Sequence, residues 1–177
     1  MRSDRVIKNE SSIAFLCADI YQSTQQISAM DVEEAREWVE PALNIMSHAV
    51  REYTGTIYQL TGDGIIAAFS GEQNALRACC AAMTLQSLLK STEIPCQVRV
   101  GVHVGNRDPQ KKNDTQAERI LIELTESVES AAAIDGVQIS AAVHDILGET
   151  VILGDAKKIA LDSGECIESY SLLQLST

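Results

Sequence analysis

A β-hairpin is encoded by TIYQLTGDGIIAAF, residues 56–69. Two short runs rich in apolar and β-branched residues, 56–60 and 65–69, flank the turn Gly62-Asp63-Gly64. Asp-Gly between two such runs is a strong hairpin signal, because these residues tolerate the backbone conformations that tight turns require. The pattern therefore predicts two antiparallel strands with the carboxylate of Asp63 at their shared tip.

A third strand is predicted upstream by SIAFLCADI, residues 12–20. Its nearly continuous apolar character is typical of a strand that is buried on both faces. This run ends at Asp19, so it also places one carboxylate where a strand stops. An Asp at a strand end or in a hairpin often serves only the turn, so each aspartate alone is weak evidence for a site.

Between the strand at 12–20 and the hairpin, apolar residues recur with helical spacing from Asp31 to Tyr53. Asp31 and Glu34 form a capping-box pattern, with Asp in place of the usual Ser or Thr. Pro41 lies inside the helical pattern, where a missing N–H predicts a kink or a break.

The rest of the chain continues the alternation of strands and helices. The predicted elements are a helix at 73–90, a strand at 96–104, a polar loop at 106–115, a helix at 116–132, a strand near 137–140, a helix near 141–147, and strands near 150–153 and 166–173. Strand, helix, hairpin, helix, strand is the βαββαβ plan of ferredoxin-like domains. We expect an α+β fold with this core and a C-terminal α/β extension. The whole of residues 1–177 is expected to form a single domain, with a polar N-terminal lead-in at 1–11.

This plan makes a geometric prediction about the two aspartates. If the first strand lies antiparallel to the second hairpin strand, Asp19 and Asp63 converge at one edge of the sheet. Paired carboxylates on strand ends can hold Mg²⁺ or Mn²⁺ and leave positions for water and phosphate. Two such ions about 4 Å apart activate an attacking oxygen and neutralise a leaving pyrophosphate.

Charge and composition restrict the partners. The formal net charge is −11, from 25 acidic and 14 basic residues, which argues against nucleic acid or an anionic membrane surface as a partner. The sequence shows no signal-peptide core and no apolar stretch of membrane-spanning length. Its five cysteines lack metal-type spacing. A cytoplasmic protein with reduced thiols is therefore expected.

Several segments, in order along residues 12–172, resemble the catalytic domain of class III adenylate and guanylate cyclases. The matching segments are AFLCADIYQST (14–24), YTGTIYQLTGDGIIAAF (53–69), ALRA (75–78), VRVGVHVG (98–105), and Glu129-Ser130 through GVQIS (136–140). The sequence is similar to this family as a divergent member.

The resemblance implies a mechanism and a set of site residues. In that family, aspartates at the positions of Asp19 and Asp63, with the backbone of Ile20, bind two Mg²⁺ or Mn²⁺ ions. The 3′-hydroxyl of a nucleoside triphosphate, ATP or GTP, attacks its own α-phosphate and expels pyrophosphate. The sites form between the subunits of an antiparallel dimer. The positions implied in nucleotide binding are Gln22, Ser23, Thr24, Gly62, Gln59 and Gln116.

Much of the family's remaining equipment is absent from this chain. The base-reading Lys is replaced by Gln59, and its partner position falls nearest Gln116. The ribose-orienting Asn is Glu123, and the transition-state Arg is Ser127. No catalytic residue is therefore recognisable at these positions. Losing a guanidinium matters, because charge that develops on the transferring phosphorus needs a fixed positive partner.

Three hypotheses remain open. In the first, the chain is the metal-supplying half of a heterodimeric cyclase, a phosphorus–oxygen lyase, and is weak or inactive alone. In the second, it is a catalytically dead domain that dimerises or senses nucleotide in cyclic nucleotide signalling. Alternatively it is a homodimeric cyclase with an unorthodox second site that uses Gln59 and the loop with Lys111 and Lys112. His103, inside an apolar strand, is interpreted as a hydrogen-bonded core residue.

Overall fold

The computed structural model describes residues 11–107 and 115–176. In chain order its elements are β1 (Ser12–Ile20), α1 (Ser23–Ile27), α2 (Val32–Glu52), β2 (Thr56–Leu60), β3 (Gly64–Ser70), α3 (Asn74–Ser91), β4 (Val98–Asn106), α4 (Thr115–Ser130), β5 (Val137–Ser140), α5 (Ala141–Leu147), the 3₁₀ turn η1 (Gly148–Thr150), β6 (Val151–Ala160) and β7 (Cys166–Leu175). The α+β class and the predicted order of elements are confirmed. All but the last residue of the lead-in at 1–11 lie outside the described residues, as do Lys111 and Lys112.

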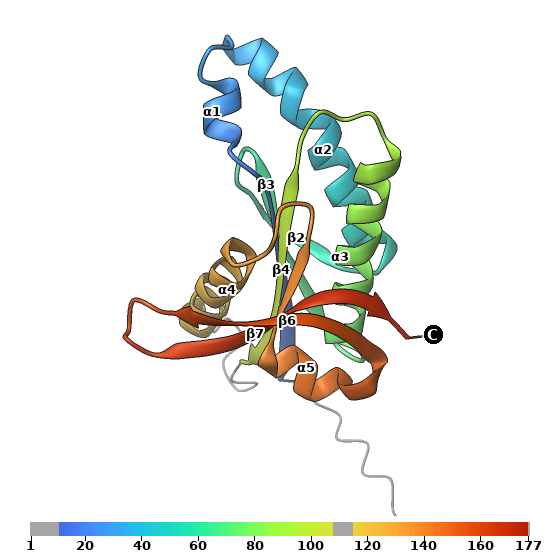
Figure 1. Ribbon diagram of the computed structural model, residues 1–177, viewed down its shortest axis with the longest axis vertical. Helices are drawn as coiled ribbons and strands as arrows, with labels where there is room; N and C mark the ends of the chain where they lie inside the picture. Colours follow the sequence, from blue (N-terminus) through green and yellow to red (C-terminus); the bar gives the residue numbers. More distant parts are fainter. Residues whose placement is uncertain (1–10, 108–114, 177) are drawn as a thin grey trace, which may run out of the picture.

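A seven-stranded sheet forms the centre of the molecule, in the order β2-β3-β1-β4-β5-β7-β6. β1 is antiparallel to β3 on one side and to β4 on the other, and β4 is parallel to β5. Figure 1 shows α2 and α3 on one face of the sheet and α4 on the other. β1 thus runs through the middle of the ferredoxin-like core, and β6–β7 is the C-terminal extension.

Alternation along β1 divides its side chains between two cores. Ala14, Leu16 and Ala18 belong to the large core under α2 and α3, whereas Phe15 and Cys17 belong to a smaller cluster with Leu121 of α4. Because successive side chains of a strand point to opposite faces, Asp19 projects on the α4 side. Figure 1 shows α4 isolated on that side.

Helix α2 differs from the prediction at one point. The capping box at its start is confirmed, since Asp31 accepts the N–H of Glu34 and Glu34 accepts the N–H of Asp31. Of the kink or break predicted at Pro41, the break is wrong, because α2 continues through this residue to Glu52. Pro41 lies on the exposed side, where water can bond the freed carbonyl, and buried neighbours such as Ala42 and Met46 hold the helix to the sheet.

Two smaller differences concern α1, which the sequence pattern did not predict, and β6, which is longer than predicted. The one-turn helix α1 was not predicted. β6 extends to Ala160, well past the predicted 150–153, because it pairs with β7 along most of its length. No helix within residues 11–107 and 115–176 combines the length and the apolar composition needed to cross a membrane.

Leu16→Ala is expected to lower the free energy of unfolding by about 2–5 kcal/mol, because the Leu16 side chain is fully buried in the central strand and its removal leaves a cavity. Urea unfolding measures the change. Leu173→Ala on β7 is the matched control, since that side chain is exposed and its loss is expected to change stability by less than about 0.5 kcal/mol. Equal effects of the two substitutions would contradict the assignment of the core.

Candidate functional site

Asp19 and Asp63 meet at one edge of the sheet. Asp19 is the penultimate residue of β1 and lies opposite Gly64 in the β1–β3 register. The N–H of Ile20 donates to the carbonyl oxygen of Asp63 over 3.1 Å. The convergence that the antiparallel arrangement predicts is therefore present, and it is fixed by backbone hydrogen bonds.

The two positions that flank Asp63 require glycine for different physical reasons. Gly62 has φ of 99°, a left-handed conformation that glycine adopts most readily. At Gly64 the constraint is space, because a Cβ would lie 2.3 Å from the carbonyl oxygen of Ala18 and 2.9 Å from Oδ1 of Asp19. Only glycine at this position lets the start of β3 approach the end of β1, and this approach brings the carboxylates together.

The carboxylate pair is electrostatically strained. Burial of Asp19, followed by the charge of Asp63 and a hydrogen bond between the two side chains, raises the pKa of Asp19 to about 6, against an opposing effect of Arg99. Asp63 is held from the other side by the buried hydroxyl of Ser23, which donates to its Oδ2. A divalent cation between the two carboxylates would relieve their repulsion, so the donor set fits Mg²⁺ or Mn²⁺.

Within the described ranges, no three or more His, Cys, Asp or Glu side chains form a group that could hold a metal ion. Any ion at this site would therefore take its protein ligands from Asp19, Asp63 and neighbouring backbone such as Ile20. Water and phosphate would supply the rest, which is how Mg²⁺ is usually bound beside a nucleotide.

Arg99 is the cation nearest to Asp19, and the sequence analysis gave it no role. The two residues lie directly opposite in the β1–β4 register. Arg99 Nε lies 2.9 Å from Oε1 of Glu129, and its guanidinium carbon is 5.4 Å from the centre of the Tyr21 ring. Burial raises the pKa of Glu129 to about 7, and Arg99 opposes that rise. The signal that could have revealed Arg99 was its register with Asp19, once β4 was placed beside β1.

The predicted nucleotide positions fall into two groups. Gln22, Ser23 and Thr24 follow β1 directly, and Gly62 precedes Asp63, so these four lie beside the aspartates. Gln22 has φ of 54°, a left-handed backbone conformation that glycine adopts most readily.

Gln59 and Gln116 form the second group. They are exposed on β2 and in the first turn of α4. Among the described residues no hydrogen bond or ion pair joins either of them to the aspartates or to each other. Within one chain, the structure therefore does not bring them into the site.

The α4 positions carry no positive charge. Glu123 is exposed and pairs with Arg119 at 3.4 Å, and the Ser127 hydroxyl donates to the carbonyl of Glu123 at 2.9 Å. Burial and the charge of Glu123 raise the pKa of Glu126 one turn away. His103 contacts Ser140 Oγ through Nδ1 at 2.8 Å, as expected of a hydrogen-bonded core histidine. Burial lowers the His103 pKa to about 4, which keeps the ring neutral.

Comparison with solved structures identifies the fold. The guanylate cyclase domain of RhGC from Catenaria anguillulae, solved in complex with GTP, superposes with a TM-score of 0.76 at 11% identity over 94% of this chain and 98% of that chain. The adenylyl cyclase CyaB from P. aeruginosa gives 0.75 at 17% identity over 94% and 95%. An adenylate/guanylate cyclase/hydrolase from Silicibacter pomeroyi gives 0.70 at 18% over 92% and 96%.

The chain therefore has the fold of class III adenylate and guanylate cyclase catalytic domains, as the sequence motifs predicted. A scan of protein-family models finds no match, and a search of curated proteins finds no similar sequence. The likeness is thus carried by the fold, at identities of 11–18% for these three structures.

Asp19→Asn is expected to raise the free energy of unfolding at pH 7 without divalent ions. The pKa of Asp19 is raised from 3.8 to about 6, so the wild-type carboxyl favours folding fully below pH 3.8, and this contribution is lost as the pH rises through about 6. The Asn variant avoids that loss, and its amide can donate to Asp63.

Urea unfolding of wild type and variant between pH 3.5 and 7.5, with a chelator present, measures this difference. The advantage of the variant is expected to grow across this window. Asp162→Asn, at an exposed position in the β6–β7 turn, controls for loss of one negative charge. A wild type as stable as Asp19→Asn at pH 7 would contradict the strain assigned to the carboxylate pair.

Proposed function

We propose that this chain is the metal-supplying half of a class III nucleotide cyclase site that another subunit completes. The observation that carries the proposal is the carboxylate pair Asp19 and Asp63, held at one sheet edge by the β1–β3 register. The reaction would convert ATP or GTP to a 3′,5′-cyclic nucleotide and pyrophosphate. The single-domain organisation and cytoplasmic location expected from the sequence belong to the same proposal.

In this function the residues of the chain would bind the metal ions and orient the nucleotide phosphates. Asp19, Asp63 and the backbone of Ile20 would hold Mg²⁺ or Mn²⁺, which when bound neutralises phosphate charge and activates the attacking hydroxyl. Ser23 keeps the Asp63 carboxylate oriented through its hydrogen bond. Gln22, Ser23 and Thr24, at the start of α1, would contact the phosphates.

The second subunit is inferred from what α4 lacks. Charge on the transferring phosphoryl group needs a fixed positive partner, and Glu123 and Ser127 provide none. A complementary subunit would bring a Lys for the base and an Arg for the transition state. Of the structures with this fold, the guanylyl cyclase domain of RhoGC from Blastocladiella emersonii is described as a non-canonical dimer in one and as a monomer in two others, so this fold is compatible with both states.

A catalytically dead domain that dimerises or senses nucleotide is the second candidate. The observation that favours it is that neither α4 position carries a positive charge, since Glu123 pairs with Arg119 and Ser127 is neutral, while Glu126 one turn on adds a carboxylate. Carboxylates there would repel a triphosphate. This candidate dimerises or senses nucleotide and excludes turnover with any partner.

Asp63→Ala is expected to weaken binding of a nonhydrolysable ATP or GTP analogue with Mn²⁺ at least tenfold, because one of two metal carboxylates is lost. Calorimetric titration measures the affinity. Asp162→Ala, which removes an exposed carboxylate far from the sheet edge, is expected to bind like wild type. Absence of Mn²⁺-dependent binding by wild type would contradict both the enzyme proposal and the nucleotide-sensing alternative.

Cyclase activity is expected only when this chain is mixed with a cyclase subunit that has the Lys and Arg but lacks the aspartates. Product formation is followed by chromatography of the cyclic nucleotide, and Asp63→Ala in the mixture should abolish it. Activity of this chain alone would instead favour the homodimer. Nucleotide binding without activity in any mixture would favour the catalytically dead module.

A further inference from the structure

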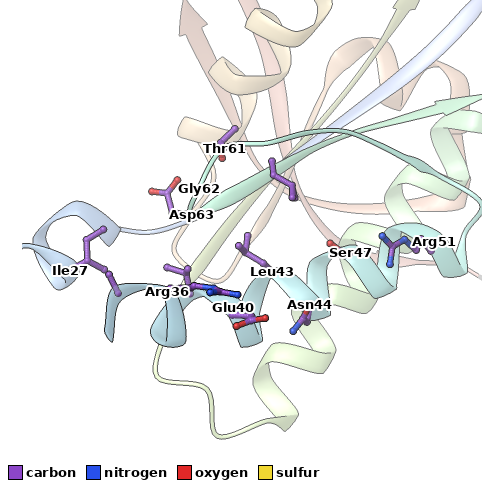
Figure 2. Close-up of a pocket in the computed structure, with 13 residues that line it drawn as sticks. Ile27, Arg36, Glu40, Leu43, Asn44, Ser47, Arg51, Thr61, Gly62 and Asp63 are labelled. Carbon is purple, nitrogen blue, oxygen red and sulfur yellow. The ribbon is translucent and has the colours of Figure 1, made fainter. Parts of the chain in front are cut away.

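A groove lies beside the candidate site, between α2 and the tip of the β2–β3 hairpin. Its volume is about 710 Å³, within the range of about 300–1,000 Å³ that is usual for small-molecule pockets. Figure 2 shows Ile27 and Asp63 at one end of the lining residues, Leu43 in the middle and Arg51 at the other end. The groove follows α2 for several turns.

The middle of the groove is apolar. Val39 and Leu43 come from α2, and Leu60 faces them from the end of β2. Leu60 is 60% exposed, whereas Val39 is nearly buried at 9%. An apolar ligand body placed here would remove Leu60 and Leu43 from water, which is the main source of affinity in pockets of this kind.

One end of the groove is polar and carries an uncompensated cation. Asn44, Ser47 and Arg51 line it, at spacings of three and four residues that place them on one face of α2. Five of the six arginines in the described ranges make an ion pair or a side-chain hydrogen bond. Arg51 makes neither among those residues.

The other charged residues lie away from the Arg51 end of the groove. Glu40 lies one turn from Arg36 on α2, and Arg36 pairs with Glu33 at 3.9 Å. Asp63 belongs to the carboxylate pair. The C-terminal dipole of α2 opposes an anion near Arg51, but the guanidinium carries a full charge with two neutral hydrogen-bonding neighbours. Charge complementarity therefore favours a ligand whose anionic group lies at the Arg51 end.

We propose that this groove binds a small anionic amphiphile. The apolar body of the ligand lies over Val39, Leu43 and Leu60, and its carboxylate, sulfonate or phosphate group contacts Arg51, Asn44 and Ser47. The hairpin wall of the groove includes Thr61, Gly62 and Asp63, so an occupant touches the segment that positions one carboxylate of the candidate metal site. Binding in the groove does not depend on the proposed cyclase function.

Anilinonaphthalene sulfonate is a suitable probe, because it combines an aromatic body with one anionic group. Fluorescence titration and calorimetry of the folded protein are expected to give saturable binding of one dye per chain. Leu60→Glu should weaken it about tenfold, through lost apolar contact and added repulsion. Arg51→Gln should weaken it about three- to fivefold, the range typical of a partly exposed ion pair.

Two matched controls make the test specific. Leu173→Glu places the same change at a leucine of similar exposure, 58%, on β7, away from the lining residues. Arg119→Gln removes an exposed arginine of α4. Both are expected to bind the dye like wild type, and near-ultraviolet circular dichroism confirms that every variant keeps its packed core.

Some outcomes would overturn the proposal. These are unsaturable dye binding, affinity unchanged by Leu60→Glu and Arg51→Gln, or equal losses in the two controls. Asp19→Ala separates this proposal from the proposed function, because Asp19 does not line the groove. That variant should lose Mn²⁺-nucleotide binding and keep the dye affinity of wild type.

Discussion

The close approach of β3 to β1 at Gly64 is the constraint on which the candidate site depends. No side chain fits there, since a Cβ would lie 2.3 Å from the Ala18 carbonyl. The approach lets the Ile20 N–H reach the Asp63 carbonyl and forces two carboxylates together. Burial, and after it the charge of Asp63, raises the pKa of Asp19. Backbone pairing along β1 and β3 holds the ends against the repulsion of the two carboxylates, which is the preorganisation that a metal site requires.

Positive charge is distributed unevenly around this pair. On the β4 side, Arg99 lies opposite Asp19 and forms an ion pair with Glu129. The charge of Arg99 is therefore partly compensated within the protein. On α4, Glu123 pairs with Arg119 and Glu126 adds a carboxylate, so neither residue offers the positive charge that a phosphate-binding site would need. Under the proposed function, a chain with a net charge of −11 would therefore need metal ions and a partner to bind a triphosphate.

Local patterns predicted the parts of the fold that local physics determines. The Asp-Gly turn, the apolar β1 run and the Asp31–Glu34 cap are short-range features, and all are present. Arg99 could not be assigned in the same way, because its position beside Asp19 depends on the β1–β4 register. The groove between α2 and the tip of the β2–β3 hairpin could not be predicted from local patterns either, because residues that are distant in the sequence line it. Helix α1, with five residues, is too short to show a period.

The asymmetry of the site bears on assembly. A homodimer would carry Gln59, Glu123 and Ser127 in both of its sites, so symmetry could not supply the missing Lys and Arg. A different subunit could, while using the aspartates that this chain holds in place. In such an assembly the other half of each pair need not keep the strained carboxylates, because one metal site per dimer suffices. In that case only this chain would need the close approach at Gly64, with its strained carboxylates. Its partner would supply the catalytic cations.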